Sequence, residues 1–158
     1  VRCYEAAYAA PLSTPYLNQE FFERIGETMT EHLLLVVAER DAKPIASALF
    51  VHDEERLYGR YWGAIADVPM LHFELCYYQA IEIAIALRLR IVEGGAQGEH
   101  KLARGFEAVP TTSAHWLAEP AFADAVERYL AHEDLRVGDY LDELRERSPY
   151  RAGASPEG

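Results

Sequence analysis

The sequence contains no hydrophobic run long enough to cross a bilayer. Its longest apolar stretches, residues 33–38 and 81–87, fall well short of the ~20 residues that a transmembrane helix needs. No charged segment followed by an apolar run opens the chain, so we expect no signal peptide. These absences predict a protein without a membrane span.

Cysteine and basic residues are also scarce. The two cysteines, Cys3 and Cys76, are too few for a disulfide framework and favour a reducing, cytoplasmic setting. Lysine and arginine number 15 against 26 acidic residues, which leaves a net charge of −11. Because nucleic-acid phosphates are bound by clustered basic side chains, this charge disfavours a nucleic-acid partner, tRNA included.

The composition is that of a folded domain. Of the 158 residues, 50% are hydrophobic and 26% are charged. We expect one domain over residues 1–150 and a flexible tail over residues 151–158, which are rich in glycine, alanine, serine and proline. The first residue is Val1, and the helical pattern after it begins without a capping residue, so we expect a piece of a longer protein.

The hydrophobic pattern predicts a mixed α/β sheet flanked by helices. Helices are expected over residues 1–10 and 18–29, the second with Asn18 as its N-cap. Three strands joined by short turns predict an antiparallel meander: 32–40, 45–52 and 57–64. A helix over residues 71–87 and a strand over residues 90–94 follow. A strand–helix–strand crossover of this kind favours parallel pairing of the strands it joins. A short helix over residues 99–104, ended by Gly105, and a strand over residues 109–117 are expected next. The last expected element is a helical region over residues 119–147, interrupted near Val137 and Gly138.

Three sequence blocks carry a resemblance to a known family. They are residues 57–63 (LYGRYWG), 71–81 (LHFELCYYQAI) and 93–106 (EGGAQGEHKLARGF), the last running on to residues 113–116 (SAHW). Together they resemble the FemAB-like proteins of peptidoglycan biosynthesis or recognition, a branch of the GNAT acyltransferase superfamily. The resemblance implies a GNAT-like sheet, the C-terminal part of a longer chain, and transfer of an acyl or aminoacyl group to an amine. Most GNAT enzymes use acyl-CoA and Fem transferases use aminoacyl-tRNA, so both are candidate donors.

Glu93 and the glycine-rich loop after it form the first candidate site. The residue ends an expected strand, where GNAT folds place their chemistry, and its carboxylate could deprotonate an attacking amine. The loop of residues 94–98 could direct backbone N–H groups at an anion or oxyanion, with Gly95, Gln97 and Gly98 as substrate-binding candidates. The alternative is a tight connection between a strand and a helix.

The start of the expected helix 71–87 is the second candidate site. In GNAT folds this helix terminus receives the pyrophosphate of CoA, usually through a glycine-rich turn, but residues 64–70 contain no glycine and include Asp67. His72 is a candidate general base because its reference pKa suits that role. Glu74 and Gln79 are candidate substrate-binding residues on the same helix. The alternative for His72 is a structural, hydrogen-bonded histidine.

The short helix 99–104 carries a third group of candidates. On this helix His100 and Arg104 share a face, and Lys101 and Arg104 could bind a carboxylate or phosphate. Lys101 stands where many GNAT enzymes carry the tyrosine that acts as general acid. We therefore include His100 and Lys101 among the catalytic candidates and Arg104 among the substrate-binding ones. The alternative is a solvated surface helix.

Aromatic residues suggest a binding cleft. Tyr61 and Trp62 lie beside Gly59 and Gly63 on an expected strand and could wall a cleft for a sugar or peptide, or pack in the core. His115 either faces that cleft or is a structural histidine. No residue spacing resembles a metal-ligand set, so no metal is expected.

Three functions remain open from the sequence. One is a transferase that acts on a small-molecule or peptide amine, and the second is a non-catalytic module that recognises a cell-wall-like glycopeptide. The third is a subunit-interface role, with a homodimer formed through exposed apolar surface.

Overall fold

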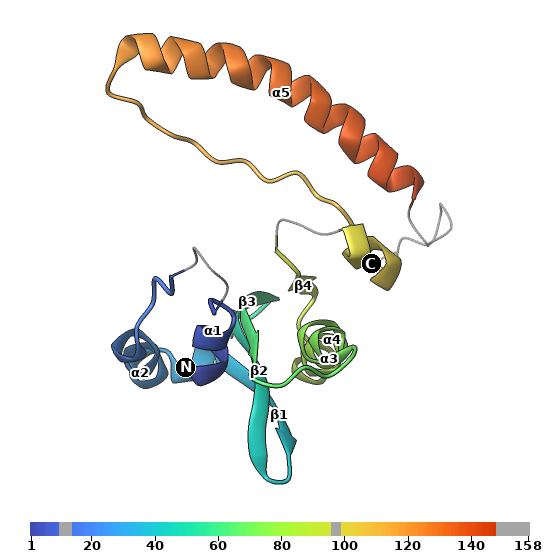
Figure 1. Ribbon diagram of the computed structural model, residues 1–158. Helices are drawn as coiled ribbons and strands as arrows, with labels where there is room; N and C mark the ends of the chain where they lie inside the picture. The colour runs from blue at the N-terminus through green and yellow to red at the C-terminus, as the bar shows by residue number, and fades with distance from the viewer. Residues whose placement is uncertain (10–13, 96–98, 148–158) are drawn as a thin grey trace. The chain divides into compact units, whose positions relative to one another are not determined.

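The computed structural model describes residues 1–9, 14–95 and 99–147 (Figure 1). The chain divides into two compact units, Val1–Ala96 and Gln97–Gly158. The first unit contains a four-stranded sheet with helices, and the second contains a short 3-10 helix and one long α-helix. The expectation of one domain over residues 1–150 stays a prediction.

The sheet of the first unit is mixed, as predicted. Its strands are β1 (Leu33–Arg40), β2 (Lys43–His52), β3 (Arg56–Ala64) and β4 (Ile91–Glu93). They lie in the order β1-β2-β3-β4, with β1, β2 and β3 antiparallel and β4 parallel to β3. Short turns allow only antiparallel pairing between the first three, whereas a crossover helix precedes β4. The predicted fold class is therefore confirmed.

A bulge in β3 determines which side chains share a face. Leu49 of β2 lies opposite Tyr61, but the next residue, Phe50, lies opposite Gly59, so Arg60 is the extra residue. Without the bulge, strand alternation would send Tyr58 and Tyr61 to opposite faces. With it, both lie on the face opposite Leu57.

Helices cover both faces of the sheet. Figure 1 shows α1 (Arg2–Ala6) and α2 (Gln19–Thr28) on one side, and α3 (Leu71–Phe73) and α4 (Gln79–Leu87) on the other. Helix α2 begins where predicted, because the side chain of Asn18 accepts a hydrogen bond from the Phe21 N–H at 2.9 Å. A π-helical turn, η2 (Glu74–Tyr78), joins α3 to α4, so the predicted helix over residues 71–87 is continuous but not uniform.

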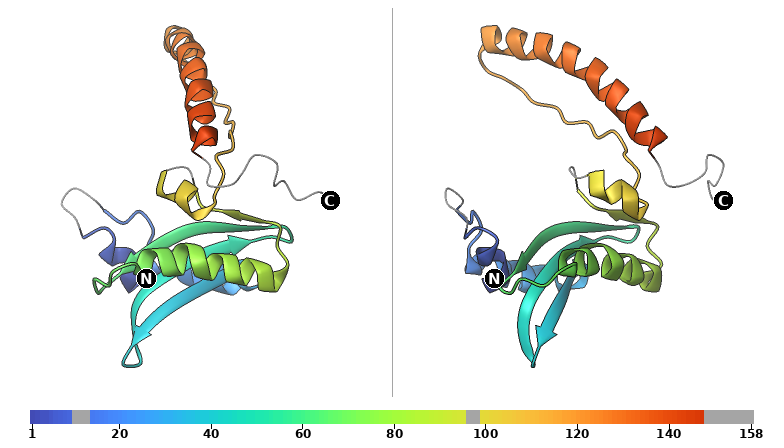
Figure 2. Two further views of the ribbon diagram at one scale, coloured as in Figure 1. Left: turned by 90° about the vertical axis from the view of Figure 1, so that its right-hand side faces the viewer. Right: turned by 45° about the vertical axis from the view of Figure 1, so that its right-hand side comes forward.

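The hydrophobic core lies between β2, β3 and the η2–α4 helix (Figure 2). Leu57 is its largest fully buried side chain, and Phe50 belongs to the same cluster. Alanines contribute from both elements: Ala46 and Ala48 from β2, and Ala80 and Ala84 from α4. Small side chains on facing elements let the helix backbone approach the sheet closely, which leaves little room for substitution.

Gly63 is required by the packing of α1. A Cβ atom at this position would lie 1.7 Å from the backbone oxygen of Cys3, far inside contact distance. Cys3 and Tyr4 are both buried by this contact with β3. Gly63 therefore permits a close backbone approach. The approaching backbone is the chain's own helix.

The second unit departs from the sequence prediction in two places. The short helix η3 (Glu99–Arg104) ends at Gly105, which has φ of 85°, as predicted. The predicted strand over residues 109–117 is wrong: these residues form no strand, Pro110 lacks an N–H for pairing, and Trp116 is 85% exposed. The predicted break at Gly138 is also wrong, because α5 (Pro120–Glu146) is continuous. One helical glycine costs only ~1 kcal/mol, which the neighbouring helix formers offset.

We expect Gly63→Ala to destabilise the protein by about 1–3 kcal/mol or more, because α1 must move away from β3. Chemical denaturation measures the free energy of unfolding. Gly26→Ala is the matched control: Gly26 lies within α2, and a Cβ there meets nothing within 4 Å. The control should gain about 0.5–1 kcal/mol. Equal effects of the two substitutions would contradict the packing of α1 against Gly63.

Candidate functional site

The candidate site lies where β3 and β4 part. The two strands pair over three residues only: Arg56 with Ile91, Leu57 with Val92, and Tyr58 with Glu93. β3 then continues to Ala64, and no strand in the described part of the chain pairs with its outer edge beyond Tyr58. Backbone N–H and C=O groups on such an edge can bind an extended ligand.

Glu93 is the last residue of β4 and is already engaged. Its carboxylate accepts a hydrogen bond from Nη1 of Arg56 at 2.7 Å, and the two side chains are 41% and 40% exposed. The hydrogen bond from the guanidinium to Glu93 raises the pKa of Arg56. The ion pair thus ties the end of β4 to the start of β3, and a substrate that contacted Glu93 would share its carboxylate with Arg56.

A second pair of polar side chains adjoins this ion pair. The hydroxyl of Tyr58 donates to Oδ2 of Asp53 at 3.1 Å. Hydrogen bonds from the backbone N–H groups of Glu55 and Arg56 lower the pKa of Asp53. Partial burial and the bond to Asp53 raise the pKa of Tyr58. Tyr58 is therefore held protonated beside Glu93.

Sequence reasoning missed Arg56, Tyr58 and Asp53. Their signal is present in the pattern, since Arg56 and Tyr58 alternate around the buried Leu57, and Glu93 ends a strand predicted to pair in parallel. Only the register of that pairing brings Arg56 to Glu93, and the sequence does not specify it. The candidate Glu93 therefore gains one hydrogen-bond partner, Arg56, and one strand neighbour, Tyr58, that the sequence pattern did not assign.

His72 lines a separate cavity of about 510 Å³, whose wall consists of Trp62 and residues 64–73. Its ring lies 5.3 Å from that of Trp62 and 5.7 Å from that of Tyr77, measured between centroids. Met70 precedes the helix with φ of 66°, a left-handed conformation that turns the chain into α3. Asp67 lines the same cavity, so a carboxylate lies near the start of α3, where the resemblance predicted a pyrophosphate site.

Glu74 and Gln79 are brought together by the π-helical turn. The amide of Gln79 donates to Glu74 at 3.0 Å and to Glu82 at 3.3 Å. In an α-helix, residues five apart do not face each other, whereas the wider π turn places them side by side. These substrate-binding candidates form one exposed polar stripe on the helix.

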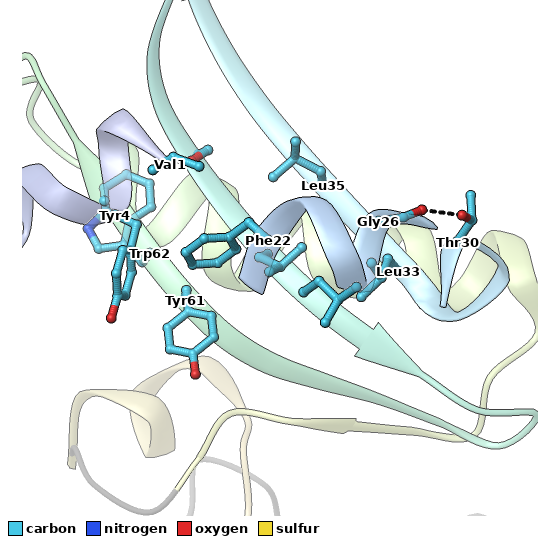
Figure 3. Close-up of a pocket in the computed structure, with 13 residues that line it drawn as sticks. Val1, Tyr4, Phe22, Gly26, Thr30, Leu33, Leu35, Tyr61 and Trp62 are labelled. Atoms are coloured by element: carbon cyan, nitrogen blue, oxygen red, sulfur yellow. Dashed lines mark hydrogen bonds between the residues drawn. The ribbon is translucent and has the colours of Figure 1, made fainter. Parts of the chain in front are cut away.

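Tyr61 and Trp62 pack on opposite faces of β3. The ring of Tyr61 lies 5.3 Å from that of Tyr4 and its hydroxyl is 3.1 Å from the hydroxyl of Tyr16. Trp62 packs against His72 and the core. Alternation along the strand explains this divergence. The two rings do not form one aromatic platform, although both residues line a cavity of about 300 Å³ beneath α1 and α2 (Figure 3).

The candidates of the second unit lie on η3 and in the irregular segment after it. Arg104 donates from Nη1 to the backbone oxygen of His100 at 2.7 Å, so the two are neighbours as predicted. Burial lowers the pKa of Lys101. His115 is exposed, with Nε2 3.1 Å from the hydroxyl of Ser113, and it does not belong to a strand.

The glycine-rich loop is described only in part. Gly95 adopts φ of 80°, a left-handed conformation that favours glycine. Gln97 and Gly98 lie outside the described residues. The roles proposed for this loop stay predictions.

Within residues 1–9, 14–95 and 99–147, no three His, Cys, Asp or Glu side chains are placed to hold a metal ion together. Over that same part of the chain, no helix combines the length and the apolar character that crossing a membrane requires.

Comparison with known proteins identifies a family. The family model FemAB-like, described as peptidoglycan biosynthesis/recognition, matches residues 1–152. No curated protein matches the sequence. The family match extends over both compact units and includes every candidate residue.

We expect Arg56 and Glu93 to stabilise the fold as a pair. A double-mutant cycle with Arg56→Ala and Glu93→Ala should give a favourable coupling that weakens with added salt, because both side chains are partly exposed. The pair Arg90–Glu55 is the control, since its arginine is 79% exposed and its contact is longer, 3.2 Å. A coupling no larger than that of the control would contradict a role in joining β4 to β3.

The tyrosines of the α1–β3 contact should make the protein sensitive to high pH. Partial burial and then the bond to Tyr16 raise the pKa of Tyr61 to about 12. A folded pKa above the unfolded value of about 10 gives stability that is complete below pH ~10 and is lost as pH rises toward ~12. Denaturation across this range should show the loss, and Tyr61→Phe should make it shallower. An unchanged pH dependence in the variant would contradict the assignment.

Proposed function

Because the chain belongs to the FemAB-like family, described as peptidoglycan biosynthesis/recognition, we propose that it transfers an acyl or aminoacyl group to an amine of peptidoglycan or its precursor. The observation that carries the proposal is the family match over residues 1–152. The GNAT-like mixed sheet is consistent with it, because this architecture hosts acyl transfer. The edge of β3 beyond Tyr58 offers the place for an extended substrate.

In the proposed reaction the acceptor amine attacks the carbonyl carbon of the donor. A C–N bond forms, the thioester or ester bond to the carrier breaks, and the amine loses one proton while the carrier gains one. Glu93 is the proposed acceptor of the amine proton, and His72 and His100 are the other proposed bases. Lys101 is the proposed proton donor, and its lowered pKa would make it a stronger acid than an ordinary lysine.

The two candidate donors are acyl-CoA and aminoacyl-tRNA. The carboxylate of Asp67 beside the start of α3 disfavours a pyrophosphate there, and the net charge of −11 disfavours tRNA. Both remain candidates, and the acceptor is a small molecule or peptide. Gly95, Gln97, Gly98, Arg104 and His115 keep their proposed roles as substrate contacts.

A recognition module is the second candidate function. The observation that favours it is the ion pair between Arg56 and Glu93, which gives the carboxylate a structural role without any chemistry. Such a module would bind a cell-wall glycopeptide along the edge of β3 and release it unchanged. Loss of Glu93 would then loosen β4 instead of stopping a reaction.

We also propose a cytoplasmic location and a homodimer for this protein. Cys3 and Cys76 are both free, and burial raises the pKa of the Cys76 thiol to about 12, so this cysteine is a poor nucleophile. Free thiols favour the proposed cytoplasmic setting. The proposed homodimer is tested by sedimentation velocity at several concentrations of the protein.

Turnover separates the two functions. The protein is incubated with a soluble peptidoglycan precursor that carries a free amine, in one arm with acetyl-CoA and in the other with aminoacyl-tRNA, and products are analysed by mass spectrometry. We expect one donor to add its group, and Glu93→Gln to slow the reaction about 10²–10⁴-fold, as loss of a general base does. Glu55→Gln is the control, because this carboxylate also lies beside Arg56.

Two outcomes would contradict the transferase. Absence of product with both donors, while the precursor still binds, would favour the recognition module. Full activity of Glu93→Gln would remove Glu93 from the chemistry and leave its pairing with Arg56 as its role.

A further inference from the structure

The cavity between the α1–α2 layer and the sheet has a lining unlike that of the candidate site. It measures about 300 Å³, and its wall includes Phe22 and Ile25 of α2, Leu33 and Leu35 of β1, and Leu49 of β2 (Figure 3). No residue that lines it has a charged side chain. A cavity of this size and character lies in the range of small-ligand pockets.

The hydroxyl groups of Thr30 and Tyr61 at the wall are hydrogen-bonded within the fold. Thr30 donates from its hydroxyl to the backbone oxygen of Gly26, as the dashed line in Figure 3 marks. The hydroxyl of Tyr61 is bonded to that of Tyr16 at 3.1 Å. A sugar or peptide needs several polar partners, whereas this cavity offers mainly carbon surface.

Gly26 has no explanation in the packing of the fold. It lies inside α2, where glycine costs about 0.5–1 kcal/mol relative to alanine. Unlike Gly63, it has no neighbour that excludes a side chain, because a Cβ there would meet nothing within 4 Å. Gly26 borders the cavity, so the open space beside it is continuous with the ligand-sized volume.

The cavity is open toward β1. Leu35 belongs to its wall and yet is 62% exposed. The next residue on the same face of this edge strand, Val37, is 41% exposed. An apolar track therefore runs from the cavity along β1.

We propose that this cavity binds an uncharged hydrocarbon chain, and that Gly26 provides the room for it. The apolar wall supplies the binding free energy through burial of the chain. None of the lining side chains is a cation, and the net charge of −11 disfavours an anionic group in the interior. The inference concerns binding only and does not depend on the proposed transfer reaction.

Fluorescence of the uncharged probe N-phenyl-1-naphthylamine tests the proposal on the full chain. The probe should brighten on binding and be displaced by 1-decanol more effectively than by decanoate. Gly26→Leu should weaken probe binding at least about tenfold, which corresponds to ~1.4 kcal/mol. Gly138→Leu is the matched control, because Gly138 also lies in a helix with open space around it but is not one of the residues that line the cavity.

A second variant fills the cavity from the sheet. Ser47→Val on β2 adds side-chain volume at the opposite wall, and valine is favoured in strands. This substitution should therefore also weaken binding of the probe. Unchanged affinity in both variants, or no binding by the natural sequence, would overturn the proposal. Equal competition by decanol and decanoate would overturn the assignment of an uncharged ligand. A dimer that dissociates in Gly26→Leu without any probe binding would assign the cavity to a second copy of the chain.

Discussion

Parallel pairing between β3 and β4 lasts for three residues, and the arrangement of the candidate site follows from where it stops. The pairing brings Glu93 opposite Tyr58 and within 2.7 Å of Arg56. It also leaves the outer edge of β3 without a described strand partner from Gly59 onward. A longer β4 would close this edge, and a shorter one would release Glu93 from the guanidinium.

The sheet separates two kinds of surface. One face is filled by small and medium apolar side chains beneath the η2–α4 helix, with Leu57 fully buried. The other face carries the Arg56–Glu93 pair at one end and the apolar cavity near Tyr61 at the other. The extra residue Arg60 is what keeps Tyr58 and Tyr61 on that second face. One bulge thus places a polar site and an apolar cavity on the same side of the sheet.

Local signals in the sequence predicted much of the fold. Asn18 caps its helix, Gly105 ends another, and short turns specify the antiparallel meander. These features depend on near neighbours in the chain. The prediction of a strand over residues 109–117 was wrong because it rested on the β-branched residues of this polar segment alone. Strand formation also depends on a neighbouring strand to pair with.

The candidate site was less predictable because it depends on register and packing. Glu93 was identified, but Arg56 was not, since their meeting depends on how two distant strands align. Tyr61 and Trp62 were expected either to wall a cleft or to pack in the core. Both line the apolar cavity, while strand alternation sends their rings to opposite faces. The contact between Glu74 and Gln79 depends on a π turn, and no residue type specifies such a turn.

Amide hydrogen exchange along β3 tests the central claim most directly. In the unliganded protein, amides of residues 59–64 that face away from β2 should exchange faster than those paired with it. Adding a soluble peptidoglycan stem peptide should slow exchange in residues 59–64, because the peptide occupies the free edge of the strand. Protection that appears elsewhere while residues 59–64 remain unchanged would contradict the assignment of this edge as the substrate site.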